Sequence, residues 1–122
     1  MPASGSVLGY AEDVLQASSA QTTGGNSGAL PGYGGANTLR LQLNVTAVSG
    51  TATPTLTVFI EDTLDGTNWN QIVAFTAATA TGIQAVNVTT PFADRLRVRW
   101  TITGTTPSIT FEVRAASQSP MA

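Results

Sequence analysis

With 122 residues and a mass of 12.5 kDa, the chain is long enough for one domain with a single hydrophobic core. It has no His or Cys, and because its five cations are all Arg it also has no Lys. The usual general base, thiol nucleophile, Schiff-base amine and soft metal ligands are therefore missing. Charged residues make up only 10% of the chain and the net charge is −2, which argues against a basic nucleic-acid-binding surface. We expect a non-enzymatic protein with no cofactor, no metal and no nucleic-acid partner.

Residues 1–37 form the first compositional segment, which holds most of the twelve glycines of the chain. Residues 21–28 have the Gly, Ser, Thr and Asn content of a flexible loop. Residues 11–17 are expected to form a short edge strand, with one helical turn as the alternative. Tyr10 and Tyr33 have no evident local core around them. We therefore predict that residues 1–37 form an extended Gly/Ser-rich arm that lies across another protein, with both tyrosines as candidate partner contacts.

From Thr38 onward, apolar residues alternate with polar ones, which is the period of a half-buried strand. Leu39, Leu41 and Leu43 point to one face in the first of these segments, and Asp65-Gly66 marks a turn further along. The alternation predicts strands over 38–46, 56–61, 69–75, 84–89, 96–102 and 109–113.

The last two strands are expected to form a hairpin across residues 104–107. This register pairs Trp100 with Phe111 and places Arg99 opposite Glu112, so apolar residues meet apolar ones and opposite charges meet. Turns at spacings of about 8–12 residues predict an all-β, antiparallel β-sandwich of about six to eight strands, jelly-roll or Ig-like. A closed barrel is the alternative. The predicted sandwich covers 38–116, between the arm and a C-terminal tail over 117–122.

Three of the five arginines alternate along one predicted strand, and we call Arg95, Arg97 and Arg99 the arginine comb. Strand alternation places all three on the same face. Such a comb can hold carboxylates of a protein partner, because Arg makes bidentate pairs with them. The alternative is an ordinary solvated strand face, neutralised in part by Glu112 and by acids on neighbouring strands. The comb is the main candidate for partner contact.

The acidic segment 62–69 contains oxygen-bearing side chains that a hard cation can use. The EF-hand spacing is absent, so we expect a turn at Asp65-Gly66, with Trp69 beginning the next strand as a core anchor. Glu61 and Asp62 are adjacent on a strand and point to opposite faces, which argues against a shared catalytic site.

Residues 56–69 (LTVFIEDTLDGTNW) and 95–100 (RLRVRW) resemble segments of small structural proteins of tailed bacteriophages, and the resemblance spans about residues 38–115. It implies a virion component, in particular a capsid cement or decoration protein. Such proteins lie on the outer capsid surface, often as homotrimers, and bind the major capsid protein. The resemblance also implies synthesis in the host cytoplasm, and on this view the arm of residues 1–37 lies across a second protomer or the capsid.

Two other functions stay open: a carbohydrate-binding or host-adhesion module, and a tail or head–tail connector component. The sequence shows neither a signal peptide nor an apolar run near the ~18 residues of a membrane span, so we expect no membrane partner. Twenty threonines take the place of charged residues. A surface rich in hydroxyl groups is cheaper to desolvate than a charged one, which favours contact with other protein.

Overall fold

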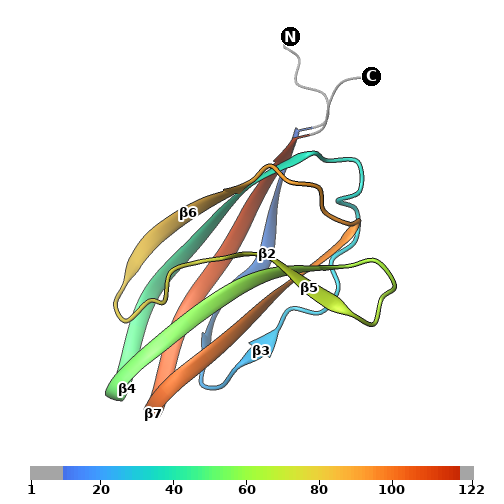
Figure 1. Ribbon diagram of the computed structural model, residues 1–122. Coiled ribbons are helices and arrows are strands. Elements are labelled where there is room, and N and C mark those ends of the chain that lie inside the picture. Colours follow the sequence, from blue (N-terminus) through green and yellow to red (C-terminus); the bar gives the residue numbers. More distant parts are fainter. Residues whose placement is uncertain (1–9, 119–122) are drawn as a thin grey trace.

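The computed structural model describes residues 10–118. This part of the chain contains six strands and no helix, so it has no helix able to cross a membrane. All six strands join one antiparallel sheet, which confirms the all-β fold expected from the sequence (Figure 1). The strands are β2 (Tyr10–Gln21), β3 (Gly25–Asn26), β4 (Thr38–Thr63), β5 (Trp69–Ala74), β6 (Gly82–Val88) and β7 (Arg95–Gln118).

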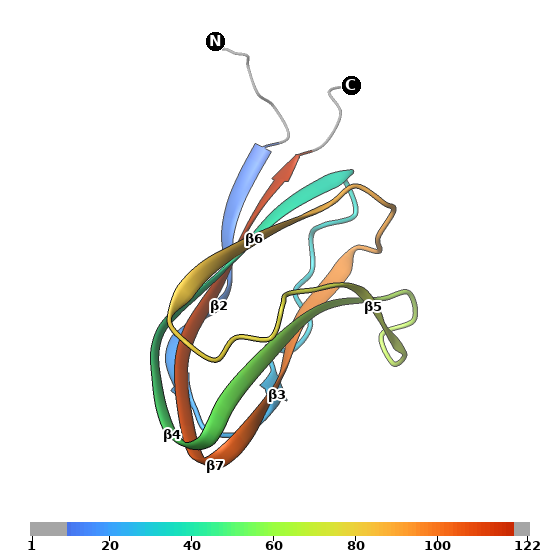
Figure 2. The ribbon, with the colours of Figure 1, turned by 60° about the vertical axis from the view of Figure 1, so that its left-hand side comes forward.

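The sheet folds over on itself into two layers because its two central strands are very long and bent. β4 and β7 pair from Thr38 opposite Gln118 to Thr63 opposite Arg95, and both turn over near their middles (Figure 2). The first layer contains β6, the first half of β4, the second half of β7, and β2. The second layer contains β5, the second half of β4, the first half of β7, and β3. The result is a β-sandwich whose layers share their central strands. No ladder within residues 10–118 closes it into a barrel.

Glycines allow the two central strands to bend. Gly50 of β4 has φ 118° and Gly104 of β7 has φ 120°, both in the region that disfavours residues with a Cβ. A Cβ on Gly104 would lie 2.9 Å from the Cα of Pro54, and one on Gly50 would lie 2.9 Å from the Cα of Pro107. The two bends therefore pack directly against each other, and each needs a glycine for both its conformation and its close contact.

The hairpin expected across residues 104–107 is wrong, because this segment is a bend within β7. Trp100 pairs with Val58 of β4 and Phe111 pairs with Val45, so the two halves of β7 pair with different halves of β4. Glu112 accordingly does not face Arg99; it binds Arg114 on its own strand, with 2.8 Å between Arg114 Nε and Glu112 Oε1. Gly, Thr and Pro serve a strand bend as well as a hairpin turn, so composition alone does not separate the two.

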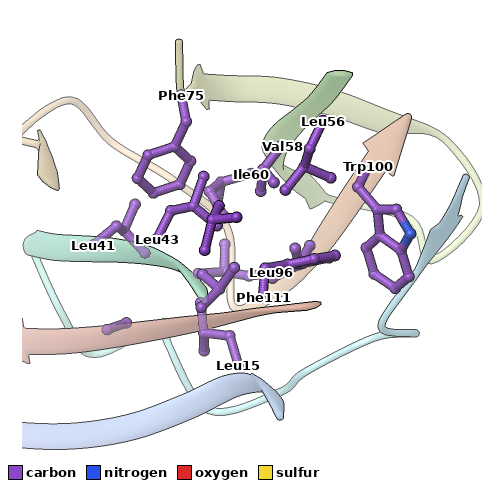
Figure 3. Close-up of a cluster of buried hydrophobic side chains, with 14 of the residues drawn as sticks. Leu15, Leu41, Leu43, Leu56, Val58, Ile60, Phe75, Leu96, Trp100 and Phe111 are labelled. Carbon is purple, nitrogen blue, oxygen red and sulfur yellow. The ribbon is translucent and has the colours of Figure 1, made fainter. Parts of the chain in front are cut away.

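The core fills the space between the layers, and the inward positions are those that the alternation predicted. Trp100 and Phe111 meet across this space edge to face, with ring centroids 5.3 Å apart and planes at 74° (Figure 3). The indole Nε1 of Trp100 donates a hydrogen bond to the carbonyl oxygen of Thr23 at 3.1 Å, which satisfies its polar group. The fully buried apolar side chains are Leu41, Leu43, Leu56, Val58, Ile60, Leu96, Val98, Ile109, Phe111 and Val113.

Residues 10–37 belong to the sandwich itself, so the expectation of an arm extended over another protein is wrong for them. β2 pairs with the second half of β7, β3 pairs with the first half, and Leu30 bridges to Leu96. Backbone groups make most of these contacts, so the polar composition of the segment did not reveal them. Residues 1–9 lie outside the described part. Of the expected C-terminal tail, Ser117 and Gln118 continue β7, and residues 119–122 lie outside the described part.

Candidate functional site

The arginine comb lies on the outward face of the second layer, as strand alternation predicts. Arg95 pairs with Thr63 of β4, Arg97 with Glu61, and Arg99 with Phe59. The residues that alternate with the comb, Leu96 and Val98 among them, are fully buried in the core. The backbone from which the three arginine side chains extend is therefore fixed by the anchoring of β7 in the sandwich.

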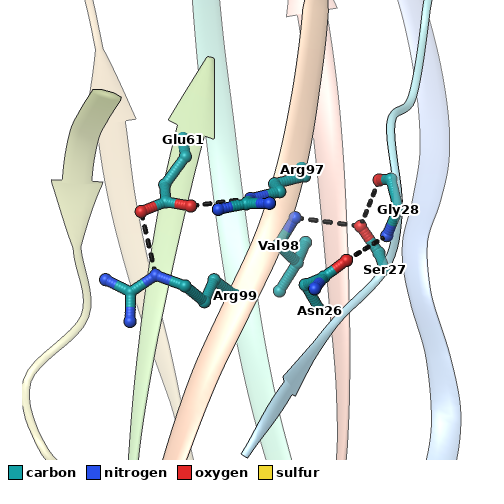
Figure 4. A network of polar contacts seen from close by, with 7 residues as sticks. All are labelled: Asn26, Ser27, Gly28, Glu61, Arg97, Val98 and Arg99. Atoms are coloured by element: carbon teal, nitrogen blue, oxygen red, sulfur yellow. Dashed lines mark hydrogen bonds and ion pairs between the residues drawn. The ribbon is translucent and has the colours of Figure 1, made fainter. Parts of the chain in front are cut away.

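One carboxylate holds two of the three arginines. Arg97 Nε lies 2.7 Å from Glu61 Oε1, and Arg99 Nε lies 2.9 Å from Glu61 Oε2 (Figure 4). The side chain of Glu61 is 8% exposed, against 21% for Arg97 and 34% for Arg99. The carboxylate thus lies beneath the two guanidinium groups. Neither guanidinium makes a hydrogen bond from its terminal nitrogens to other residues of 10–118.

Two aromatic rings support the same guanidinium groups from the sheet surface. The Cζ of Arg97 lies 4.4 Å from the centroid of the Trp69 ring, and the Cζ of Arg99 lies 4.1 Å from that of Phe59. Cation–π contacts of this kind add attraction and restrict the side chains. The expectation that Trp69 is a core anchor is therefore wrong: its side chain is half-buried, lies against Arg97 and is not part of the hydrophobic core cluster.

The segment after β4 forms the turn expected at Asp65-Gly66. Asp65 Oδ1 accepts hydrogen bonds from the backbone N–H groups of Thr67 at 2.8 Å and Asn68 at 2.7 Å. Its Oδ2 accepts a hydrogen bond from the Asn68 side-chain amide at 2.7 Å. Backbone hydrogen bonds from Asn68 and Thr67, together with the Asn68 amide, hold the pKa of Asp65 well below its usual value. Both oxygens therefore serve the turn itself, and no group of three or more potential metal ligands occurs in the described part.

The charges of Arg97 and Arg99 are not fully cancelled by Glu61. Two guanidinium groups share one carboxylate, which leaves one formal positive charge on these three side chains. Burial alone raises the pKa of Glu61, but hydrogen bonds and charge from Arg99 and Arg97 outweigh it, so the pKa is below its ordinary value. Glu61 is thus ionised at neutral pH. The arrangement suits binding of anionic groups, since the outer edges of two rigid guanidinium groups face away from the carboxylate.

The two tyrosines proposed as partner contacts have different environments. Tyr10 begins β2, is 44% exposed, and donates a hydrogen bond to Glu12 Oε2 at 2.6 Å. Tyr33 is only 6% exposed, and its hydroxyl donates to Asp13 Oδ2 at 3.2 Å. The expectation that Tyr33 anchors an arm on a partner is therefore wrong, because its ring belongs to the core of its own chain.

Sequence reasoning found the comb but missed the residues that support it. The role of Glu61 depends on the pairing of 56–63 with 95–102, and the erroneous hairpin had assigned Arg99 to Glu112 instead. One signal was present in the sequence: Glu61 is the acid in the outward-pointing series of Thr57, Phe59 and Glu61. Pairing that series with the comb would have brought the charges together.

Replacing Glu61 tests how much its ion pairs with Arg97 and Arg99 contribute to stability. Glu61→Gln should lower the free energy of unfolding at pH 7 by about 1–3 kcal/mol, because hydrogen bonds to charged groups are lost from a buried position. The lowered pKa of Glu61 means that its contribution is present above its unfolded-state pKa and is lost as the pH falls through the lower folded-state value. Urea unfolding from pH 7 down to pH 2 should show the difference in free energy of unfolding between the wild type and Glu61→Gln disappearing below about pH 4.

The control for this prediction is Glu112→Gln, which removes a carboxylate bound to a more exposed partner, Arg114 at 57%. It should lower the free energy of unfolding much less than Glu61→Gln does, because exposed ion pairs contribute little to stability. Equal losses for the two variants would contradict the idea that Glu61 is the organising residue of the comb.

Tyr33 should titrate far from its normal range. Burial, followed by the charge of Asp13 and the hydrogen bond to it, raises the pKa of Tyr33 to about 12. Because the folded-state pKa exceeds the unfolded value of 10.0, its stabilising contribution should be complete below that value and be lost as the pH rises toward 12. In a Tyr10→Phe variant, Tyr33 is the only phenol of the chain, so the ultraviolet absorbance of phenolate reports it alone. A midpoint near 10 would show that the ring is not buried as described.

Comparison with known proteins supports the fold. No family model matches the sequence, and no curated protein sequence matches it. Among solved structures, PBSX exported protein XepA has a similar fold, with a TM-score of 0.62 and 16% sequence identity. The match covers 92% of this chain and 38% of the XepA chain, so this chain spans less than half the length of that protein. At this identity the likeness establishes a shared all-β fold.

Proposed function

We propose that this chain is a non-enzymatic structural protein of a tailed-phage virion, of the capsid cement or decoration type. In this proposal it lies on the outer capsid surface, binds the major capsid protein and associates with further copies of itself, as a homotrimer. The observation that carries the proposal is the arginine face: the comb together with Glu61, Phe59 and Trp69.

The segments that resemble phage structural proteins lie together in space. Residues 56–69 supply the second half of β4 and the following turn, and residues 95–100 supply the first half of β7. These two segments pair along their length and build the arginine face. The two segments therefore form one continuous part of the second layer, whose alternate residues, such as Leu56 and Leu96, are buried in the core and whose other residues carry the arginine face.

The physical design of the face suits adhesion to acidic protein. Arg97 and Arg99 are already fixed by Glu61 and by two aromatic rings, so binding costs little side-chain entropy. Their free terminal nitrogens fit carboxylates of a partner in a bidentate manner. Modest contacts of this kind add up when many copies bind a repeating lattice.

A catalytic role is not part of the proposal. Both oxygens of Glu61 accept hydrogen bonds from arginines, and both oxygens of Asp65 accept hydrogen bonds within its turn. These carboxylates serve to hold the surface in shape.

The likeness to XepA, which is named an exported protein, fits a chain that acts away from the cytoplasm in which it is made.

The test uses particles of the phage that encodes the chain, prepared without it. Purified chain should co-sediment with these particles, and electron microscopy should place it on the outer capsid surface. The double variant Arg97→Lys/Arg99→Lys keeps the charges beside Glu61 but loses the planar donor pairs, and should bind at least about tenfold more weakly, or 1.4 kcal/mol. Arg114→Lys, on the other layer, should bind like the wild type. Absence of the chain from the virion, or its location only in the tail, would contradict the proposal.

A further inference from the structure

The outward face of the first layer carries a polar depression that the proposed function does not use. Two adjoining hollows, of about 300 Å³ and about 500 Å³, share Arg40 and Ala116 in their walls. We call the combined depression the Ala116 hollow. It lies across four strands, because one cross-strand row runs from Glu12 on β2 to Ala116 on β7, Arg40 on β4 and Asn87 on β6.

The hollow results from a small residue between long ones. Ala116 pairs with Glu12 on one side and with Arg40 on the other. Outward side chains on a sheet stand roughly perpendicular to it, so a methyl group flanked by two long side chains leaves space above itself. The hollow is therefore encoded by a single position, and a larger residue at 116 would fill it without entering the core.

Hydrogen bonds hold several wall residues in place. Arg40 donates from Nη1 to Asn87 Oδ1 at 2.9 Å, and the hydroxyl of Tyr10 donates to Glu12 Oε2 at 2.6 Å. Arg114 is held by Glu112 through bonds of 2.8 Å and 3.2 Å. A polar wall that is already ordered binds a ligand with less entropic cost than a flexible one.

The charges of the hollow distinguish it from the arginine face. Its smaller part is lined by two carboxylates, Glu12 and Asp13, and two guanidinium groups, Arg40 and Arg114, and Arg114 is itself paired with Glu112, so the wall carries no excess of positive charge. Such a wall offers both hydrogen-bond donors and acceptors and does not attract an anion. It favours a neutral ligand with many hydroxyl groups, each of which both donates and accepts.

Apolar surface at the rim completes the match. Tyr10 is 44% exposed and lines one hollow, and Val14 is 46% exposed and lines the other. An amphipathic ring beside a polar wall suits a sugar, which has apolar C–H faces and polar edges. We propose that the Ala116 hollow binds neutral saccharide units of a glycan.

Labelled full-length chain should first be applied to an array of neutral and acidic glycans, where neutral glycans should be retained preferentially. The strongest neutral glycan is then titrated by calorimetry into the wild type, Ala116→Leu and Ala85→Leu. Ala116→Leu should weaken binding at least about tenfold because the added side chain occupies the hollow. Ala85→Leu should leave binding unchanged, because Ala85 is exposed on β6, opposite Gln42, and does not line the hollow.

A second variant tests the same hollow in case Ala116→Leu does not fold. Arg40→Gln shortens an exposed wall residue whose side chain bonds only to Asn87 within residues 10–118, and it should also weaken glycan binding. Unfolding midpoints of all variants are measured alongside. Retention of no neutral glycan, preference for acidic glycans, or wild-type binding by both Ala116→Leu and Arg40→Gln would overturn the inference. Because no phage particle is used, these outcomes leave the capsid proposal to its own test.

Discussion

Replacing Gly104 by Ala should lower the free energy of unfolding by about 3 kcal/mol. The residue has φ 120°, and a backbone in such a region costs a residue with a Cβ on the order of 1–3 kcal/mol. The new Cβ would also lie 2.9 Å from the Cα of Pro54, which belongs to the facing bend and cannot rotate away. Urea unfolding, followed by tryptophan fluorescence, measures the loss.

Two other glycines separate the cost of the positive φ from the cost of the close contact with Pro54. A Cβ added to Gly35 would have no heavy atom within 4 Å, and the residue has no positive φ, so Gly35→Ala should change stability by less than about 1 kcal/mol. Gly32 has the same free space but φ 102°, so Gly32→Ala carries the backbone cost alone. If Gly104→Ala were no more destabilising than Gly32→Ala, the two bends would not be packed against each other as the structure has them.

The same bends explain which part of the fold the sequence predicted. Alternation identified the inward residues correctly, since Val98, Trp100, Phe111 and Val113 are all buried. It did not identify their partners, because a bent strand and a hairpin both interrupt the alternation with Gly, Thr and Pro. Strands of 26 and 24 residues are far longer than the usual 3–10, so separate shorter strands were the natural interpretation.

For the candidate site, the sequence likewise predicted which face the residues occupy but not which residues they contact. The position of the comb on one face follows from alternation alone and is correct. Its chemistry depends on Glu61, Phe59 and Trp69, which come from two other strands and are placed by the pairing of β4 with β7 and with β5. A property that depends on pairing between distant segments cannot be obtained from the local pattern of one strand.

The N-terminal segment shows a further limit of composition. Its Gly and Ser content suggested a flexible arm, yet Gly25 lies where a Cβ would come within 3.0 Å of the Trp100 ring. Here glycine permits close packing of the chain onto an aromatic side chain. Ser27 likewise has a structural role, because its hydroxyl accepts a hydrogen bond from the N–H of Val98 at 3.0 Å (Figure 4). Small residues thus allow close contact with β7 in this chain.

Replacing Phe111 by Ala should have the largest effect of any single change, a loss of about 3–5 kcal/mol in the free energy of unfolding. The ring is fully buried, lies in the first layer, and contacts Trp100 of the second. Its removal leaves a cavity between layers whose central strands are continuous, so the layers cannot close fully over it. Phe111→Leu, which keeps most of the volume, should cost about half as much.

A double-mutant cycle with Trp100→Leu tests the contact itself. Edge-to-face aromatic pairs contribute about 0.5–1.5 kcal/mol beyond the area that they bury, so the two substitutions together should cost less than the sum of the single losses by about that amount. This coupling joins residues of one strand that lie in different layers. Strict additivity would mean that the two rings do not touch. That result would contradict the structure, in which β7 runs from one layer into the other and brings the rings together.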